Sequence, residues 1–148
     1  MEIVTTGKAI VSVRIENLRD VYLADEGALP EEEIRAIDVT EALVDTTATL
    51  LSMPRMLVGK LGLNRTGTRT LRTSAGTFQF GIYDAVRLAL QGRDCIVEVA
   101  QVPDDCPVLI GKVPLGLLDF VVDSTGQKLM GNPEHGGKHI IDMFLVEN

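Results

Sequence analysis

The sequence has no apolar run of the roughly 18 residues that a membrane-spanning helix requires, although 45% of its 148 residues are hydrophobic. Its first residues, Met1 to Gly7, also lack the basic region and long apolar run of a secretory signal. We therefore expect a cytoplasmic protein with no membrane partner. This length suffices for one domain with a hydrophobic core, and no linker or repeat divides the chain, so we expect a single domain over residues 1–148.

Basic residues are few as well. The 14 Lys and Arg residues stand against 21 Asp and Glu residues, which gives a net charge of −7, and only residues 60–72 are locally basic. Binding to nucleic acid is driven by clustered positive charge. We expect no nucleic-acid partner.

Residues that commonly hold metals or cofactors are scarce. The two cysteines, Cys95 and Cys106, lack a Cys-x-x-Cys spacing, and the stretch between His135 and His139 contains two glycines that oppose a helix. Residues 62–67 have the glycine spacing of a phosphate loop but are not followed by lysine, and there is no Gly-x-Ser-x-Gly elbow. We expect no metal and no organic cofactor, and we interpret both histidines as loop residues.

Short runs rich in Val, Ile, Thr and Leu dominate the chain and are separated by Gly, Pro, Asn and Asp, which is typical of β-strands. Residues 8–16 alternate between apolar and polar side chains, as in a strand with one buried face. We predict further strands at 39–44, 68–73, 77–90, 95–102, 107–111, 120–122, 128–130 and 139–146, a turn at 124–127, and short helices at 30–35, 53–61 and 113–118. The fold class is therefore mainly β, in a closed or nearly closed barrel.

The most informative segment is residues 42–51, where an apolar strand ends at Asp45 and is followed by Thr46, Thr47 and Ala48. An aspartate at a strand end with an apolar wall behind it is partly desolvated, and its pKa is open to tuning. On local chemistry alone, the simpler interpretation is a turn that the side chain of Asp45 caps.

Residues 43–51 resemble the active-site segment of aspartic peptidases, in which two apolar residues precede Asp-Thr-Gly-Ala and a hydroxyl residue. Two later segments extend the resemblance: Ser52-Met53-Pro54 before a helix that ends at Lys60-Leu61-Gly62-Leu63, and Val108-Leu109-Ile110-Gly111 before a helix and Leu118-Asp119-Phe120. Together with residues 132–137, these segments are similar to the small stand-alone prokaryotic members of the retropepsin-like (retroviral-type) family.

The resemblance implies a single-lobe acid-protease β-barrel. Since the chain has one Asp-Thr segment, it also implies a homodimer in which Asp45 of each copy forms the catalytic pair of an aspartic endopeptidase acting on a peptide or protein substrate. The family assigns supporting roles to three groups: the active-site loop at Thr46, Thr47 and Ala48, a substrate-binding flap at Ser74, Ala75, Gly76 and Thr77, and a buttress behind the loop at Leu109, Ile110 and Gly111. Dimer contacts are expected at Thr46, Ile140, Ile141, Phe144 and Val146.

The chain departs from the family pattern in two places. Thr47 occupies the position of the family's glycine, and a β-branched residue restricts the backbone and adds bulk beside the reacting centre. Residues 17–38 form an insertion relative to viral members and are expected to be peripheral. A catalytically impaired dimerisation or peptide-binding module of the same fold is therefore a second hypothesis, and an unrelated β-barrel binding protein is a third.

Overall fold

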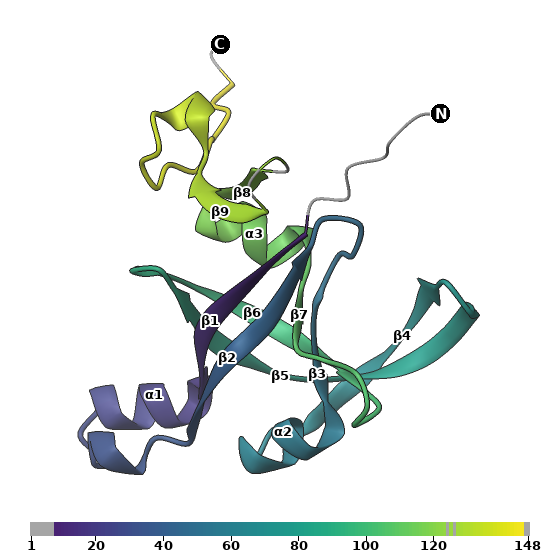
Figure 1. Cartoon of the computed structure of the whole chain (residues 1–148). Helices are drawn as coiled ribbons and strands as arrows, with labels where there is room; N and C mark the ends of the chain where they lie inside the picture. Colours follow the sequence, from purple (N-terminus) through teal and green to yellow (C-terminus); the bar gives the residue numbers. More distant parts are fainter. Residues whose placement is uncertain (1–7, 124, 126, 147–148) are drawn as a thin grey trace.

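The computed structural model describes residues 8–123, 125 and 127–146. Its elements follow one another as β1 (Lys8–Asn17), α1 (Leu18–Asp25), a 3-10 turn (Glu31–Glu33), β2 (Ala36–Asp45), β3 (Leu51–Pro54), α2 (Arg55–Lys60), β4 (Arg65–Thr73), β5 (Gly76–Leu90), β6 (Arg93–Val102), β7 (Leu109–Ile110), α3 (Lys112–Leu118), β8 (Phe120–Asp123), β9 (Lys128–Gly131) and a second 3-10 turn (Pro133–His135). The protein is mainly β, as predicted (Figure 1). Residues 1–7, 124 and 126 lie outside the described residues. The structure therefore does not test the expected lack of a secretory signal, and it describes only part of the turn predicted at 124–127.

Seven strands form one sheet in the order β1-β2-β7-β3-β6-β5-β4, and β1 also pairs with β5. Residues 14–17 of β1 provide that second pairing, so the first six strands of the order are connected in a ring. The pattern of β1 explains its place, because Ala9, Val11, Val13 and Ile15 all point into the core while the residues between them are more exposed. Strands β8 and β9 form a small second sheet near the C-terminal end, and its buried Phe120 and Leu129 belong to the same hydrophobic core as the main sheet (Figure 1).

The last strand of the order, β4, forms a long hairpin with β5 that projects from the body of the molecule (Figure 1). Every residue of β4 except Leu71 is exposed. Strand β5 is exposed near the hairpin tip and becomes buried from Ile82 onward, where it enters the core. The hairpin is therefore anchored through the second half of β5.

The insertion at residues 17–38 contains helix α1, which was not predicted. Asn17 caps this helix by accepting a hydrogen bond from the N–H of Asp20 (3.1 Å), and its amide donates to the carbonyl of Leu61 (2.7 Å). The buried carboxylate of Asp20 in turn accepts three hydrogen bonds from Arg35, at 2.8–3.0 Å. The insertion lies beside the start of β2, at the end of that strand opposite to Asp45 (Figure 1).

Three other sequence predictions need correction. The helix predicted at 53–61 begins only at Arg55, because Met53 and Pro54 continue β3 and pair with β6. The strand predicted at 107–111 is limited to Leu109–Ile110. Residues 139–146 do not form a strand, since no other strand of the described chain supplies the hydrogen bonds that a strand requires.

Among the described residues, no helix combines the length and the apolar character that crossing a membrane would demand.

Candidate active site

Asp45 is the last residue of β2, and the chain turns immediately after it. Thr46 and Thr47 form the turn, and the N–H of Ala48 donates to the carbonyl of Asp45 (3.1 Å). The strand that leads into the turn is buried at Ala42 and Val44, whose side chains point to the opposite face from Asp45, and the Asp45 side chain is 13% exposed. The predicted setting of a carboxylate at the end of an apolar strand is therefore present.

The carboxylate of Asp45 is held from one side by Thr47. Its Oδ1 accepts hydrogen bonds from the Thr47 N–H (2.9 Å) and from the Thr47 hydroxyl (2.6 Å). Asp45 thus caps its own turn, as the simpler interpretation expected. Its Oδ2 lies 3.9 Å from Nζ of Lys8 and receives no hydrogen bond from any residue that the structure describes. One carboxylate oxygen is therefore held by the turn, whereas the other has only the ion pair with Lys8 among the described residues.

These contacts decide the pKa of Asp45. Partial burial alone would raise it, but the two hydrogen bonds from Thr47, with a smaller contribution from the positive charge of Lys8, lower the pKa below its ordinary value. In the single chain, Asp45 is therefore an anion at neutral pH.

The predicted buttress lies directly behind the Asp45 loop. Strand β7 runs between β2 and β3, parallel to β2 and antiparallel to β3. Leu109 and Ile110 therefore pair both with the strand that enters the loop and with the strand that leaves it. The N–H groups of Gly111, Lys112 and Val113 then donate to the carbonyls of Leu50, Ala48 and Thr49, respectively, at 2.9–3.0 Å. Three consecutive backbone donors therefore hold the far side of the turn.

Gly111 makes this arrangement possible. A Cβ atom at this position would lie 2.6 Å from the backbone carbon of Thr49 and 2.7 Å from the carbonyl oxygen of Leu50. These are backbone atoms that cannot rotate out of the way, so only glycine fits. The active-site loop and the buttress predicted from the sequence are thus brought into contact.

The residues predicted as a flap, Ser74 to Thr77, lie at the tip of the β4–β5 hairpin. The Thr73 hydroxyl organises the tip by donating to the Gly76 carbonyl (2.9 Å) and accepting from the Ala75 N–H (3.1 Å). In Figure 1 the tip is well separated from the end of β2, so the structure does not bring the flap residues onto Asp45.

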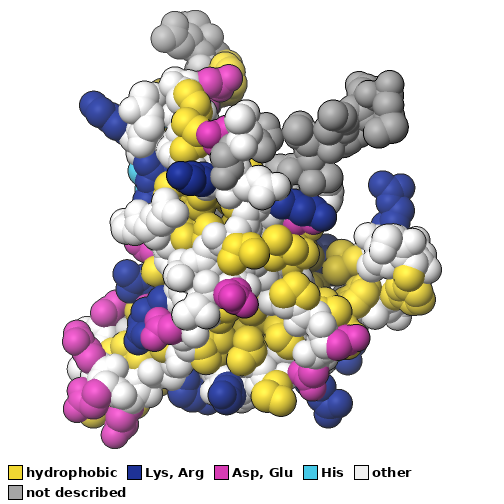
Figure 2. Space-filling model, viewed as in Figure 1, with side chains coloured by type: hydrophobic (Ala, Val, Ile, Leu, Met, Phe, Trp, Pro, Cys, Tyr) yellow, Lys and Arg dark blue, Asp and Glu magenta, His cyan; other side chains and the backbone are white. Residues whose placement is uncertain are grey.

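One face of the hairpin combines three apolar side chains, Leu71, Phe78 and Phe80, with the charged Arg69. Leu71 pairs with Phe78 and Arg69 with Phe80, and directly paired residues share a face of the sheet. That face continues along β5 to the buried Ile82. Hydrophobic side chains also gather in the middle of the molecular face shown in Figure 2 and continue toward the hairpin. The region between the hairpin and the body is therefore largely hydrophobic.

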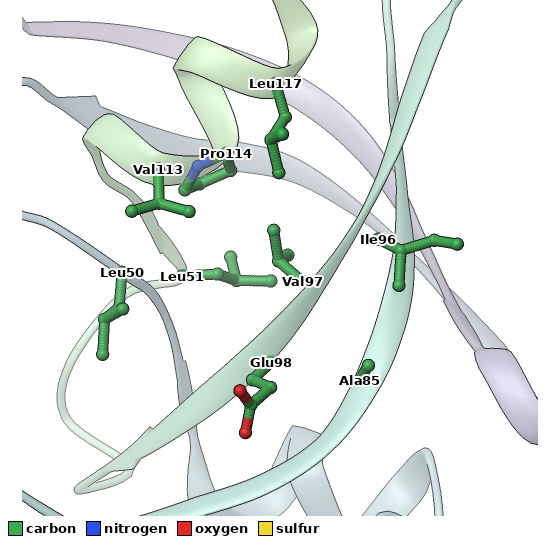
Figure 3. Close-up of a pocket in the computed structure, with 9 residues that line it drawn as sticks. All are labelled: Leu50, Leu51, Ala85, Ile96, Val97, Glu98, Val113, Pro114 and Leu117. Carbon is green, nitrogen blue, oxygen red and sulfur yellow. The ribbon is translucent and has the colours of Figure 1, made fainter.

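A separate hollow of about 310 Å³ lies next to the Asp45 loop and was not predicted (Figure 3). Leu50 and Leu51, which follow the loop, form part of its wall, and Val113, Pro114 and Leu117 of α3 form another part. Its remaining wall comes from β5 and β6, with Glu98 as the one charged lining residue. Asp45 does not line this hollow, so it is distinct from the candidate catalytic site.

The two histidines have different surroundings. His139 contacts the carbonyl of Leu117, whereas His135 lies between the carboxylates of Asp119 and Asp142. The spacing of the histidines indicated neither arrangement. Within the described part of the chain, no group of three or more His, Cys, Asp or Glu side chains is arranged so that it could hold a metal ion.

No model of a known protein family matches this sequence, and no curated protein matches it either.

The contact at Gly111 generates a prediction about stability. Gly111→Ala should lower the free energy of unfolding by about 1 to 3 kcal/mol, the usual effect of overpacking, because the backbone of residues 48–50 must move. The matched control is Gly116→Ala in α3, where a Cβ would meet nothing within 4 Å and should add about 0.5–1 kcal/mol of stability. Urea denaturation of both variants measures the difference, and similar stabilities for the two would contradict the proposed contact.

Proposed function

We propose that this protein is a retropepsin-like aspartic endopeptidase in which two copies each contribute Asp45 to one catalytic site. The observation that carries the proposal is the Asp45 loop itself. A carboxylate at the end of an apolar strand is held by its own turn on one side, and a glycine-ended strand supports that turn from behind.

The strand pairing supports the same proposal. We infer that the ring of pairings through β1, β2, β7, β3, β6 and β5 is the single-lobe barrel of this family, with the β4–β5 hairpin as its flap. The hairpin face that carries Leu71, Phe78 and Phe80 would cover a bound peptide and exclude water from it.

The homodimer follows from the chemistry. The proposed reaction needs two catalytic carboxylates. One chain offers only Asp45 in such a loop, so the catalytic pair requires a second copy. The C-terminal apolar segment (residues 140–146) would form part of the interface, because its large side chains are uncovered in the single chain: Met143, Phe144, Leu145 and Val146 are 80–97% exposed. Apolar surface of this kind is stabilised when a partner covers it.

In the dimer, the two Asp45 carboxylates would lie close enough to share one proton and to titrate as a unit. The ionised member would remove a proton from the attacking water, and the protonated member would polarise the scissile carbonyl. A lowered pKa in the single chain fits the first role. The second role would require the neighbouring negative charge that only the dimer supplies.

A non-catalytic peptide-binding or dimerisation module is the second candidate, and a specific observation favours it. The hydroxyl of Thr47, which stands where the family has glycine, occupies Oδ1 of Asp45 at 2.6 Å. If that hydrogen bond persists in the dimer, it opposes the protonation that one member of a catalytic pair needs.

Asp45→Asn tests the catalytic role. An amide cannot remove a proton from water, so turnover of a mixed peptide library should fall by several orders of magnitude, as measured by mass spectrometry. The exchange is nearly isosteric, and circular dichroism and thermal unfolding should show an intact fold. Cleavage that persists in pure Asp45→Asn protein would rule out Asp45 as the catalytic group. A lack of cleavage by a dimeric wild-type protein would favour the binding module.

Thr47 should set the pH range of the activity. Thr47→Val removes the hydroxyl while keeping the branched shape, and so it should raise the pKa of Asp45 and move the acidic limb of kcat/KM to higher pH. Thr47→Ser retains a hydroxyl and should keep the wild-type limb. Hydrolysis measured from about pH 3 to 8 compares the three proteins.

Thr47→Gly separates the two candidates further. In an active peptidase, it should raise activity or broaden the range of substrates by restoring the family's open backbone. In a binding module whose cleft has changed elsewhere, the single reversal should restore nothing. Identical pH profiles for wild type and Thr47→Val would show that the hydroxyl does not tune Asp45.

The dimer should depend on the C-terminal apolar segment. Phe144 is 97% exposed in the single chain, and covering a phenylalanine side chain stabilises an interface by about 1.5–3 kcal/mol, so Phe144→Ser should weaken dimerisation at least about tenfold. Met56→Ser, at a 63% exposed position of α2 outside the proposed interface, is the matched control. Sedimentation equilibrium gives both dissociation constants. A wild-type protein that stays monomeric at high concentration would contradict the dimer and the catalytic proposal together.

A further inference from the structure

Asp119 is a buried carboxylate that the proposed catalysis does not use. It follows α3 in the left-handed conformation (φ 57°), which is uncommon for a residue other than glycine, and its side chain is 8% exposed. Three donors from separate parts of the C-terminal region reach it: Nδ1 of His135 (2.6 Å), the N–H of Ile140 (3.1 Å) and the amide of Asn132 (3.2 Å). Asp119 therefore joins the end of α3 to the start of the C-terminal apolar segment.

His135 faces a carboxylate on each side of its ring. Nδ1 contacts Asp119, and Nε2 lies 3.2 Å from Oδ2 of Asp142, which is within the C-terminal apolar segment. A neutral imidazole has one N–H, and a carboxylate can only accept, so both contacts are hydrogen bonds only when His135 carries its second proton. The His135 ring is 14% exposed and Asp119 is 8% exposed, so the contact with Asp119 is shielded from water, whereas Asp142 is 79% exposed and its contact borders the solvent.

The pKa values agree with this geometry. Burial alone would raise the pKa of Asp119, but the hydrogen bonds from His135, Ile140 and Asn132 and the charge of His135 lower it to about 2. The hydrogen bond to Asp119 raises the pKa of His135 above its ordinary value, and Asp142 adds to that effect against the partial burial of the ring. Asp119 thus remains an anion over the whole range in which His135 titrates.

One further charged group contacts this region. Arg93 of β6 donates to the carbonyls of Leu118 (3.0 Å), Asp119 (2.8 Å) and Gly137 (2.6 Å), and its guanidinium lies 4.4 Å from the centre of the Phe120 ring. The remaining titratable neighbours along the chain, Glu134, Lys138 and His139, are exposed.

We propose that His135 is a pH-sensitive bridge that fixes the direction of the C-terminal apolar segment. When protonated, it holds Asp142 against Asp119. When it loses its second proton, it keeps the Nδ1–H bond to Asp119 but presents an unprotonated Nε2 to the Asp142 carboxylate. Two acceptors then face each other, and Asp142 leaves. Among the described residues, the segment then keeps one hydrogen bond to the body, from the Ile140 N–H to Asp119.

The direction of the pH effect follows from the raised pKa of His135. The stability that the bridge contributes is fully present below the ordinary histidine pKa of about 6.5 and is lost as the pH rises through the higher pKa of the folded protein. On the acid side, the low pKa of Asp119 keeps its carboxylate charged down to about pH 2. The bridge is therefore closed in mildly acidic solution and open in alkaline solution.

The His135 bridge also affects dimerisation, a consequence that rests on the proposed function. If the C-terminal apolar segment forms the dimer interface, a fixed segment binds with less loss of conformational entropy than a loose one. Dimerisation, and with it the assembly of the Asp45 pair, should then be tighter below the His135 pKa than above it.

The bridge can be tested by NMR without reference to catalysis. The full-length protein carrying His139→Gln leaves His135 as its only histidine, and its ring signals give the pKa directly. Backbone ¹⁵N order parameters for residues 140–146 report the motion of the segment at each pH. We expect a His135 pKa above about 6.5 and order parameters that fall as the pH rises through that same value.

Asp142→Ala removes the second carboxylate from an exposed segment, so the fold is retained. It should lower the pKa of His135 and leave the segment mobile at every pH. Glu134→Ala is the matched control, because it removes an exposed acid next to His135 whose side chain makes no hydrogen bond within the described residues. An unchanged His135 pKa in Asp142→Ala, or order parameters that do not respond to the titration, would overturn the bridge.

Sedimentation equilibrium on both sides of the His135 titration tests the link to assembly. A dimer that dissociates at least several-fold more readily above the His135 pKa supports the link, and a dissociation constant that ignores the titration overturns it. Protein that is monomeric at every pH would contradict the proposed function instead, and the NMR results on the bridge would stand independently.

Discussion

The contact between the backbone of Gly111 and the backbone of residues 48–50 is the constraint on which the Asp45 loop depends. Because no side chain intervenes, β7 can pass between β2 and β3 and offer three consecutive N–H groups to the loop carbonyls. The turn is therefore held by main-chain bonds, which do not depend on the loop's side chains. The Asp45 carboxylate adds a contact within the turn through Oδ1 and Thr47, while its Oδ2 takes no part in holding the loop.

Asp45 and Asp119 show how the origin of the donors changes what a carboxylate can do. In both residues, hydrogen bonds outweigh burial and lower the pKa. The donors to Asp45 come from one residue two positions away and use one oxygen, whereas those to Asp119 come from His135, Asn132 and Ile140 and use both. The first arrangement leaves Oδ2 of Asp45 without a hydrogen bond from the described residues, and the second fastens distant segments of the chain together.

Much of this structure could be predicted from local sequence patterns, and the failures have physical causes. Alternation and turn residues located the main strands and the β4–β5 hairpin. Helix α1 was missed although Asn17 and Asp20 carry an ordinary helix-start signal, because its apolar face is short. The apolar residues at 139–146 indicated a surface that needs covering, but a strand also needs a partner. The role of His135 could not be predicted, since its partners lie 16 and 7 residues away and meet it only in the fold.

Strand β4 has a consequence for how copies of this chain meet. It is an edge strand, with main-chain groups that could pair with the edge of another molecule, and such edges are sites of unwanted association. Arg65, Arg69 and Arg72 line it, so two hairpins approaching edge to edge would bring together two rows of like charge. This repulsion weakens as added salt shortens its range. Edge-to-edge pairing of two hairpins is therefore disfavoured most strongly at low salt.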